Sequence, residues 1–362
     1  MCVVCNTDSQ LHVIQDALAA TEDILNEYLR VPISKATELN DPAGFDKAVA
    51  ALSAKLRRAT QSDDTAALRE AIAVLDVDWS NTTATQRRSL IGQAMAAAGR
   101  ATQQVPEKIS TTFGAAANDV VRATRNHSRQ VQNLGIAADF NALDRRIVDY
   151  LKTSQSAYVR DEYGRRLDQF GAEARRIVSE GLESGFGRQD ISRSLEVAAK
   201  SALVNKSPYY WEVVAGAFMS TGRSFAQMSA YAEAGIERYI IEAVLDERTT
   251  ETCRFLHGKS FPVKSALDRF DRIAAMDQPE DIKQVHPWVR ESINPDTGNK
   301  QLYVTRGKTR IPIAEVTKSA LGTKDTPGEF KSALSEKDLN DLGIGFPPYH
   351  GLCRTTTVAD IS

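Results

Sequence analysis

The chain has few cysteines and no long apolar segment, and each shortage argues against a class of protein. Only 4 of its 362 residues are cysteine, which argues against a disulfide-rich secreted scaffold. No apolar run approaches the roughly 20 residues that a membrane-spanning helix needs, so we expect no membrane partner. Residues 1–6 lack the basic and apolar regions of a secretory signal peptide. These absences predict a protein that is made and used in a cytoplasm, or inside a particle assembled there.

Signatures of catalysis are missing as well. The sequence contains no phosphate-binding loop of the form Gly-x4-Gly-Lys-Ser/Thr and no zinc-deaminase pattern of His-x-Glu followed by Pro-Cys-x2-Cys. A nucleophilic pair of Cys253 and His350 is conceivable, yet no feature of the sequence argues for it. We therefore predict that the chain is not an enzyme.

The composition is that of an ordinary globular chain, but the charge is uneven. Hydrophobic residues make up 42% and charged residues 25% of a chain whose net charge is −2. Residues 1–86 carry 7 basic and 13 acidic side chains, residues 87–206 carry 19 and 13, and residues 207–362 carry 19 and 21. The basic middle segment could contact the phosphates of DNA. Its interspersed acidic residues are more typical of a solvated helix surface.

Apolar residues recur at helical spacing over most of the first 235 residues. The two longest predicted helices meet at a turn over residues 133–135, which predicts a long antiparallel hairpin. Residues 181–195 superficially resemble a helix-turn-helix, although helix–turn–helix units are also common in packing without any DNA contact. Helices are predicted at 10–30, from Asp41 to a break at 61–64, at 65–77, at 84–132 with at least one kink or break at Pro106 or Gly114, at 137–183, from 188, and from 208.

After residue 235 the pattern changes to short β-branched runs between turn residues. We therefore predict a mainly α protein with a small α+β domain at its C-terminal end. The predicted divisions are a helical region at 1–135, a helical body at 136–235 and the α+β domain at 236–362. Strands are predicted at 238–245, 260–263, 301–305, 309–313 and 355–358, a short helix near 336–339, and mostly loop with one helix over 264–300.

Two short clusters of metal-binding residues lie about a hundred positions apart. Cys253 and His257 are spaced as on one helical turn, and His350 and Cys353 follow in a second cluster. Thiolate and imidazole are the ligands of a tetrahedral structural zinc site. The pattern predicts a knuckle of these four residues around zinc. A disulfide, or a metal-free core in which the cysteines pack as small apolar groups, is the alternative. The CxxC pair of Cys2 and Cys5 could also bind a metal or do redox chemistry.

The paired motif resembles the C-terminal domain of the phage Mu protein F-like minor head proteins, also called phage head morphogenesis proteins. The resemblance covers about residues 170–362, and it includes Tyr-x2-Ala-Gly-Ile at 231–236 and Pro-Pro-x-His-x2-Cys-Arg at 347–354. Relatives often end in Cys-Arg-Cys, where this chain has Thr355, and often lack His257, so the fourth ligand stays open. The family's motif positions fall on Asp246, Arg248, Thr249, Cys253, Gly258, His350, Cys353 and Arg354.

The resemblance implies a minor component of a tailed phage or prophage particle. Such proteins associate with the portal protein, or with other capsid or scaffold proteins, and assist head assembly, DNA packaging or DNA delivery. The implied location is the capsid interior or portal vertex, with the host cytoplasm during assembly. In that setting Asp246 and Arg248 would orient the zinc ligands or fix a turn as an ion pair.

Two other functions fit parts of the sequence. A zinc-dependent hydrolase or toxin would use Cys253, His350 and Cys353 as ligands and Glu251 as the general base. A DNA-binding accessory protein would use the basic segment 87–206.

Overall fold

The computed structural model describes residues 39–204, 208–332 and 334–361. The helix predicted at 10–30 and the Cys2/Cys5 pair lie outside these residues. The described chain is mainly helical, with small antiparallel sheets near its C-terminal end, which confirms the predicted fold class at that level.

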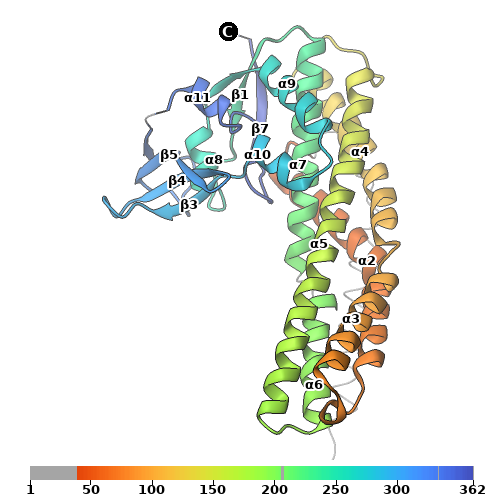
Figure 1. Cartoon of the computed structure of the whole chain (residues 1–362). Coiled ribbons are helices and arrows are strands. Elements are labelled where there is room, and N and C mark those ends of the chain that lie inside the picture. The colour runs from red at the N-terminus through yellow and green to blue at the C-terminus, as the bar shows by residue number, and fades with distance from the viewer. Residues whose placement is uncertain (1–38, 205–207, 333, 362) are drawn as a thin grey trace, which may run out of the picture.

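Long helices make an elongated stalk, and a compact module lies beside one end of it (Figure 1). The longest helix, α5, has 42 residues and is therefore about 63 Å long. We call α2 to α7 the stalk and residues 236–361 the C-terminal module. The stalk consists of α2 (Pro42–Leu75), η1 (Trp79–Asn81), α3 (Ala84–Ala101), α4 (Val105–Gln130), α5 (Ala142–Glu183), α6 (Arg188–Ala199), the π-helical turn η2 (Lys200–Val204) and α7 (Pro208–Glu233).

Polar residues at the helix starts explain where several helices begin. Asp41 caps α2 by accepting a 2.8 Å hydrogen bond from the Gly44 N–H, and Pro42 follows at the first helical position, as predicted. Thr83 and Gln86 form a capping box that starts α3. The break predicted at Pro106 or Gly114 lies just before Pro106, since α3 ends at Ala101 and α4 starts at Val105 and continues through Gly114.

The predicted break at residues 61–64 is wrong, because α2 runs through it without interruption. The polar residues that suggested a loop are instead contacts between helices. Asp64 is buried and accepts a 2.7 Å hydrogen bond from the Tyr163 hydroxyl on α5. Asp63 pairs with Lys108 of α4 at 2.7 Å. Tertiary contacts here outweigh the weak helix preference of aspartate.

The helix predicted from residue 137 begins only at Ala142. Asn141 and Asp144 form a capping box that fixes this start. The guanidinium of Arg125, on α4, is buried and pairs with Asp144 at 2.9 Å and with Glu233 of α7 at 2.7 Å. This buried cation therefore joins α4, α5 and α7 where the loop between α4 and α5 crosses the end of the stalk.

Two hydrophobic clusters fill the molecule, one toward each end of the stalk. The larger contains apolar residues from the first half of α2, from α4, the first half of α5, α7 and the C-terminal module. The smaller contains the second half of α2, η1, α3, the second half of α5, α6 and η2. The aromatic side chains of α7 belong to the larger cluster through Trp211, Phe218, Phe225 and Tyr231, whereas Tyr209 is exposed.

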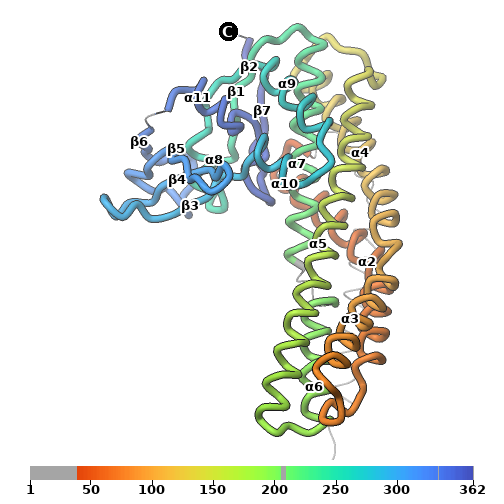
Figure 2. The backbone as a smooth tube through the Cα atoms, in the orientation of Figure 1, coloured from red at the N-terminus to blue at the C-terminus, as the bar shows by residue number. Residues whose placement is uncertain are grey.

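The C-terminal module contains two antiparallel sheets, and the tube in Figure 2 follows the chain between them. The first has the order β2–β1–β7, and the second has the order β3–β4–β5–β6. The segment 264–300, predicted to be mostly loop with one helix, contains two helices and a strand instead. The module's elements are β1 (Arg238–Glu242), α8 (Glu251–Leu256), β2 (Ser260–Pro262), α9 (Val263–Ala274), α10 (Pro279–Val285), β3 (Arg290–Ile293), β4 (Lys300–Arg306), β5 (Thr309–Lys318), β6 (Glu329–Lys331), α11 (Glu336–Asp341) and β7 (Thr356–Asp360).

Helix α7 leads directly into the module and also packs against it. Gly235 has φ +73°, and the Ile236 N–H donates to the Tyr231 carbonyl, so the helix ends in a Schellman-type turn. Further back on α7, Gly216 lies so close to the loop at 349–353 that an added Cβ would be 2.6 Å from the Gly351 carbonyl oxygen. The helix backbone and this loop are therefore in direct contact.

We predict that Gly216→Ala lowers the free energy of unfolding by about 1–3 kcal/mol, because the new methyl group overlaps a backbone oxygen. Gly92→Ala is the matched control. Gly92 is exposed within α3, and no atom lies within 4 Å of the place that an added methyl group would take, so alanine should stabilise the helix by about 1 kcal/mol. Urea unfolding of both variants checks the pair. Equal effects of the two substitutions would contradict the close contact.

Candidate metal centre

The first cysteine is positioned by the short helix α8. Thr250 caps this helix, and its side chain accepts a 3.4 Å hydrogen bond from the Cys253 N–H. Cys253 is 3% exposed and faces the interior. The thiol is therefore held by a capped helix rather than by a loose loop.

The second cluster lies on the loop that precedes β7. Its backbone is held by neighbouring elements: the Tyr239 hydroxyl donates to the Gly345 carbonyl at 2.7 Å, and the Val289 N–H donates to the Tyr349 carbonyl at 3.2 Å. His286 Nε2 lies 3.1 Å from the Phe346 carbonyl oxygen. Burial, and then the charge of Arg269, lower the pKa of His286 to about 3, so this imidazole is a neutral donor at pH 7.

Cys253 of the first cluster lies beside His350 and Cys353 of the second. Cys253 Sγ lies 3.3 Å from His350 Nε2 and 3.8 Å from Cys353 Sγ. The ligand atoms of all three residues lie within 4.8 Å of one another, and both cysteines are buried while His350 is half-buried. In the described part of the chain this is the only such group of three or more possible metal ligands.

Two of the distances between possible ligand atoms are compatible with a tetrahedral zinc ion. Zinc–sulfur bonds near 2.3 Å and zinc–nitrogen bonds near 2.0–2.1 Å at tetrahedral angles place two sulfurs about 3.8 Å apart, and a sulfur and a nitrogen about 3.6 Å apart. The two pairs measured here are 3.8 Å and 3.3 Å. The same distances also suit hydrogen bonds between thiols and an imidazole. The group is therefore compatible with a metal and with a metal-free core.

The three groups shift one another's protonation. Burial alone would raise the pKa of the Cys353 thiol, but the hydrogen bond from Cys253 and the positive charge of His350 lower it well below its usual value. The hydrogen bond to Cys353, and then burial, raise the pKa of Cys253. Burial would lower the pKa of His350, yet the negative charge on Cys353 raises it. The site thus favours a thiolate on Cys353, which is the form that binds metals.

His257, the fourth predicted ligand, is not part of the group. Helix α8 ends at Leu256, and the backbone of His257 turns to φ −55° and ψ 133°. Its Nδ1 accepts a 3.2 Å hydrogen bond from the Ala243 N–H on the other side of the turn. The spacing predicted that Cys253 and His257 lie on the same side of one helix. The helix ends at Leu256, one residue before His257, so the two side chains do not share a face.

Asp246 ties the two motif halves together, but with a different partner than predicted. Its carboxylate accepts a 2.7 Å bond from the Arg354 guanidinium and a 3.0 Å bond from the Arg248 N–H. The Thr249 hydroxyl lies 2.9 Å from the same oxygen. The Arg248 side chain instead pairs with Asp46 on α2 at 2.6 Å. The ion pair next to the site is therefore Asp246–Arg354.

Gly258 lies at the turn after α8. Its φ is +78°, a conformation that residues with a side chain rarely adopt, and its N–H donates to the Ile241 carbonyl at 2.8 Å. The motif glycine therefore shapes the turn toward β2 and does not contact the metal-binding atoms.

Two buried arginines were missed by the sequence analysis. Arg254 donates to the carbonyls of Thr249, Asp246, Thr323 and Thr326, and so joins the loop before α8 to the loop between β5 and β6. Arg223, on α7, donates to the carbonyls of Arg354 and Thr355 at 2.8 and 2.9 Å. Burial lowers the pKa of Arg223 to about 10. The position of Arg254 directly after Cys253 is the one signal that could have revealed it.

Glu251, the general base of the hydrolase alternative, does not belong to the three-residue group. Its side chain is buried, and one carboxylate oxygen accepts a hydrogen bond from the Ser319 hydroxyl. Its role in the described structure is to join α8 to the segment after β5.

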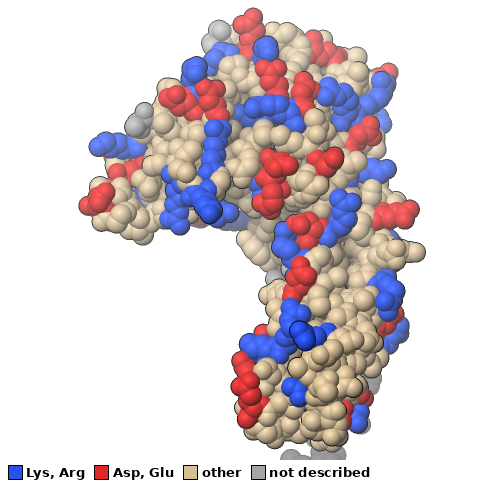
Figure 3. Space-filling view, viewed as in Figure 1, with Lys and Arg blue, Asp and Glu red and all other residues tan. Residues whose placement is uncertain are grey.

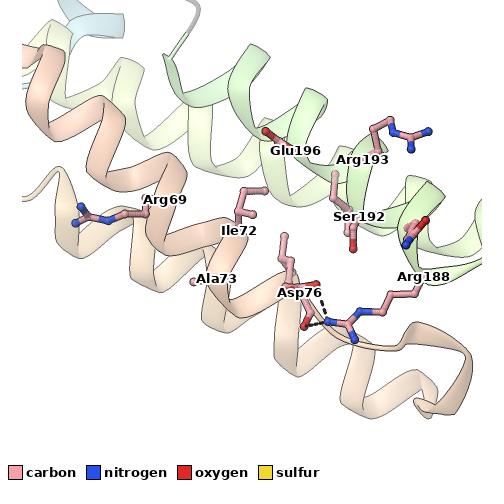
Figure 4. Close-up of a pocket in the computed structure, with 11 residues that line it drawn as sticks. Arg69, Ile72, Ala73, Asp76, Arg188, Ser192, Arg193 and Glu196 are labelled. Atoms are coloured by element: carbon pink, nitrogen blue, oxygen red, sulfur yellow. Dashed lines mark hydrogen bonds and ion pairs between the residues drawn. The ribbon is translucent and has the colours of Figure 1, made fainter.

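A concavity lies at the far end of the stalk, between α2 and α6 (Figure 4). Its volume is about 610 Å³. Arg188, one of the residues that line it, is held by Asp76 at 2.8 Å. Ile191 and Leu195, within the segment that resembles a helix-turn-helix, are buried in the smaller hydrophobic cluster. We assign no ligand to this place.

No protein-family model matches the chain, and neither a curated protein nor a solved structure matches it. The resemblance of residues 170–362 to phage minor head proteins therefore stays a prediction from the paired motif. Within the described residues, no helix combines the length and apolar character required to cross a membrane.

We predict that Asp246→Asn lowers the free energy of unfolding by about 2 kcal/mol at pH 7, since it removes a charge-assisted bond to Arg354. Burial would raise the pKa of Asp246, but hydrogen bonds from Arg354 and Thr249 lower it below its usual 3.8. A depressed carboxylate pKa stabilises the fold above the unfolded pKa and loses that contribution as the pH falls through the folded pKa. The difference between the two proteins should therefore shrink below about pH 4.

Urea unfolding at pH 7, 5 and 3 measures this difference. Glu247→Gln is the control, because Glu247 lies on the same turn but is exposed and pairs with Lys324 at the surface, where ion pairs contribute little. A difference between wild type and Asp246→Asn that does not change with pH would contradict the assignment.

Proposed function

We propose that this chain is a minor head protein of a tailed phage or prophage, whose C-terminal module is closed by a structural zinc ion. The observation that carries the proposal is the meeting of Cys253, His350 and Cys353 across 100 residues of sequence. Supporting it is the resemblance of the paired motif to phage head morphogenesis proteins. The proposed role is assembly of the particle rather than turnover of a substrate.

In this proposal Cys253, His350 and Cys353 would hold the zinc, and the fourth ligand of the tetrahedral site is not assigned. The ion would supply cross-linking: it would join α8 to the loop before β7, and would thus fix both motif halves. Asp246 and Arg354 orient the same two segments from the outside. Binding of structural zinc to a small module stabilises its folded state by about 10 kcal/mol or more.

Two observations favour an assembly role over the hydrolase alternative. Glu251 bonds to Ser319 and is not in the ligand group, so the residue suggested as general base would have to leave its partner. The half-buried His350 is flanked by two buried cysteines, an arrangement that suits a fixed cross-link.

The length of the stalk would allow the protein to contact one partner at each end. We propose that the long helical hairpin of α4 and α5 and the helices around it act as a spacer, with the C-terminal module at one end. Its partners would be the portal protein and other capsid or scaffold proteins, at the portal vertex or in the capsid interior.

The DNA-binding alternative receives less support. Basic and acidic side chains alternate over the face of the stalk in Figure 3. Arginines of the basic segment form ion pairs within the chain, including Arg165 with Glu162, Arg176 with Glu180, and Arg188 with Asp76. Paired arginines are less free to neutralise phosphates, so we do not propose packaged DNA as the main partner.

We predict that the purified protein binds one zinc ion per chain, and that Cys353→Ser lowers zinc affinity by more than about 100-fold, beyond the effect of changing residues around the ligands. His257→Asn should keep the zinc, because His257 bonds to Ala243 instead. A Cys2→Ser/Cys5→Ser double variant is the second control. Competition with a chromophoric chelator measures the affinities. Equal zinc affinities of wild type and Cys353→Ser would contradict the assignment of Cys353 as a zinc ligand.

The assembly role has its own test. We expect mass spectrometry to detect this chain in purified procapsids or mature heads made by a phage or prophage that encodes it, at a copy number far below that of the major capsid protein. Its absence from both particles would contradict the proposal, whatever the outcome of the zinc experiment.

A further inference from the structure

The two sulfur atoms of the site are close enough to react with each other. They are 3.8 Å apart, and a disulfide bond of about 2.05 Å requires them to approach by less than about 2 Å. Cys253 lies on α8 and Cys353 on the loop before β7, and both are free thiols. Among the described residues these are the only cysteines, so neither has a competing partner there.

A disulfide and a metal ion need the same two sulfur atoms. Zinc binds thiolates, and a disulfide sulfur no longer carries the negative charge that holds the ion. After oxidation, only the His350 imidazole of the three ligands would remain. The oxidised chain would keep a link between the same two segments, now as a covalent bond across 100 residues.

We propose that Cys253 and Cys353 are a redox-active dithiol, which a small-molecule disulfide oxidises to an intramolecular disulfide, and that zinc binding and this oxidation exclude each other. The inference shares its site with the proposed zinc function, but the oxidation itself does not depend on zinc. It gives the site two alternative cross-links, one ionic and one covalent.

The reaction has two exchange steps. One sulfur of the pair, as its thiolate, attacks one sulfur of the external disulfide, forms a mixed disulfide and releases one small thiol. The other protein sulfur, 3.8 Å away, then attacks the first protein sulfur and releases the second small thiol. Two protein thiols become one disulfide, the external disulfide is reduced to two thiols, and the two protons leave with them.

The experiment uses the full-length chain with Cys2→Ser and Cys5→Ser, so that only the pair at 253 and 353 remains. The zinc-free protein is incubated in glutathione buffers of increasing oxidised fraction and then mapped by non-reducing peptide mass spectrometry. We expect a peptide that links Cys253 to Cys353, a loss of two hydrogen atoms from the intact mass, and reversal by reductant. Absence of the linked peptide at every ratio would overturn the inference.

Zinc-loaded protein forms the second arm. We expect oxidation at least about tenfold slower than without zinc, with zinc released in step with disulfide formation. Oxidation at the same rate with zinc bound, or a disulfide that still retains zinc, would overturn the mutual exclusion.

Two variants separate this inference from the zinc proposal. His350→Ala removes one proposed ligand but neither sulfur, so it should lose zinc affinity and still form the disulfide. Cys353→Ser should stop at a stable mixed disulfide of glutathione with Cys253. Disulfide formation in a wild-type chain that never binds zinc would support the dithiol and defeat the zinc proposal, whereas zinc binding without any disulfide would do the reverse.

Discussion

The direct contact between α7 and the loop before β7 is the constraint on which the candidate site depends. Gly216 leaves room for the carbonyl of Gly351, and an added Cβ at Gly351 would in turn lie 2.4 Å from Val213. The loop before β7 therefore packs closely against α7. From this position His350 and Cys353 contact Cys253 on α8. Arg223, from the same helix, then fixes the backbone just beyond Cys353 through two carbonyls.

Buried arginines hold together segments that are far apart in the sequence. Arg125 joins three helices of the stalk, Arg254 gathers the loops around α8, and Arg223 links α7 to the entry of β7. Each guanidinium offers five donors in a rigid plane, so it can satisfy several backbone carbonyls that would otherwise be buried without partners. The strands of the sheet β2–β1–β7 have only three to five residues, and the hydrogen bonds of Arg223 and Arg254 hold the loops that flank this sheet.

Helix positions and the pairing of distant motifs could be predicted from the sequence, whereas the details of the site could not. Caps such as Asp41 and Thr83 are local signals, and they gave correct helix starts. The break expected at residues 61–64 failed because Asp64 is held by Tyr163, a partner 99 residues away. His257 failed for a similar reason: its helix ends early, and a hydrogen bond from Ala243 turns the ring away. The partner of Asp246 is Arg354, in the loop before β7 and 108 residues away, and no local pattern reveals that contact.

The division of the stalk into two hydrophobic clusters has a consequence for how the molecule opens. The smaller cluster contains residues of the stalk alone, while α2 and α5 continue from it into the larger cluster, so we expect the far end to open more readily than the residues that enclose Cys353. Cooperative units of this kind exchange their amide protons at separate rates. The far end of the stalk therefore offers a place where the chain can rearrange on meeting a neighbour while its cysteine-bearing end keeps its shape, and hydrogen exchange that is equally slow in both halves would contradict this division.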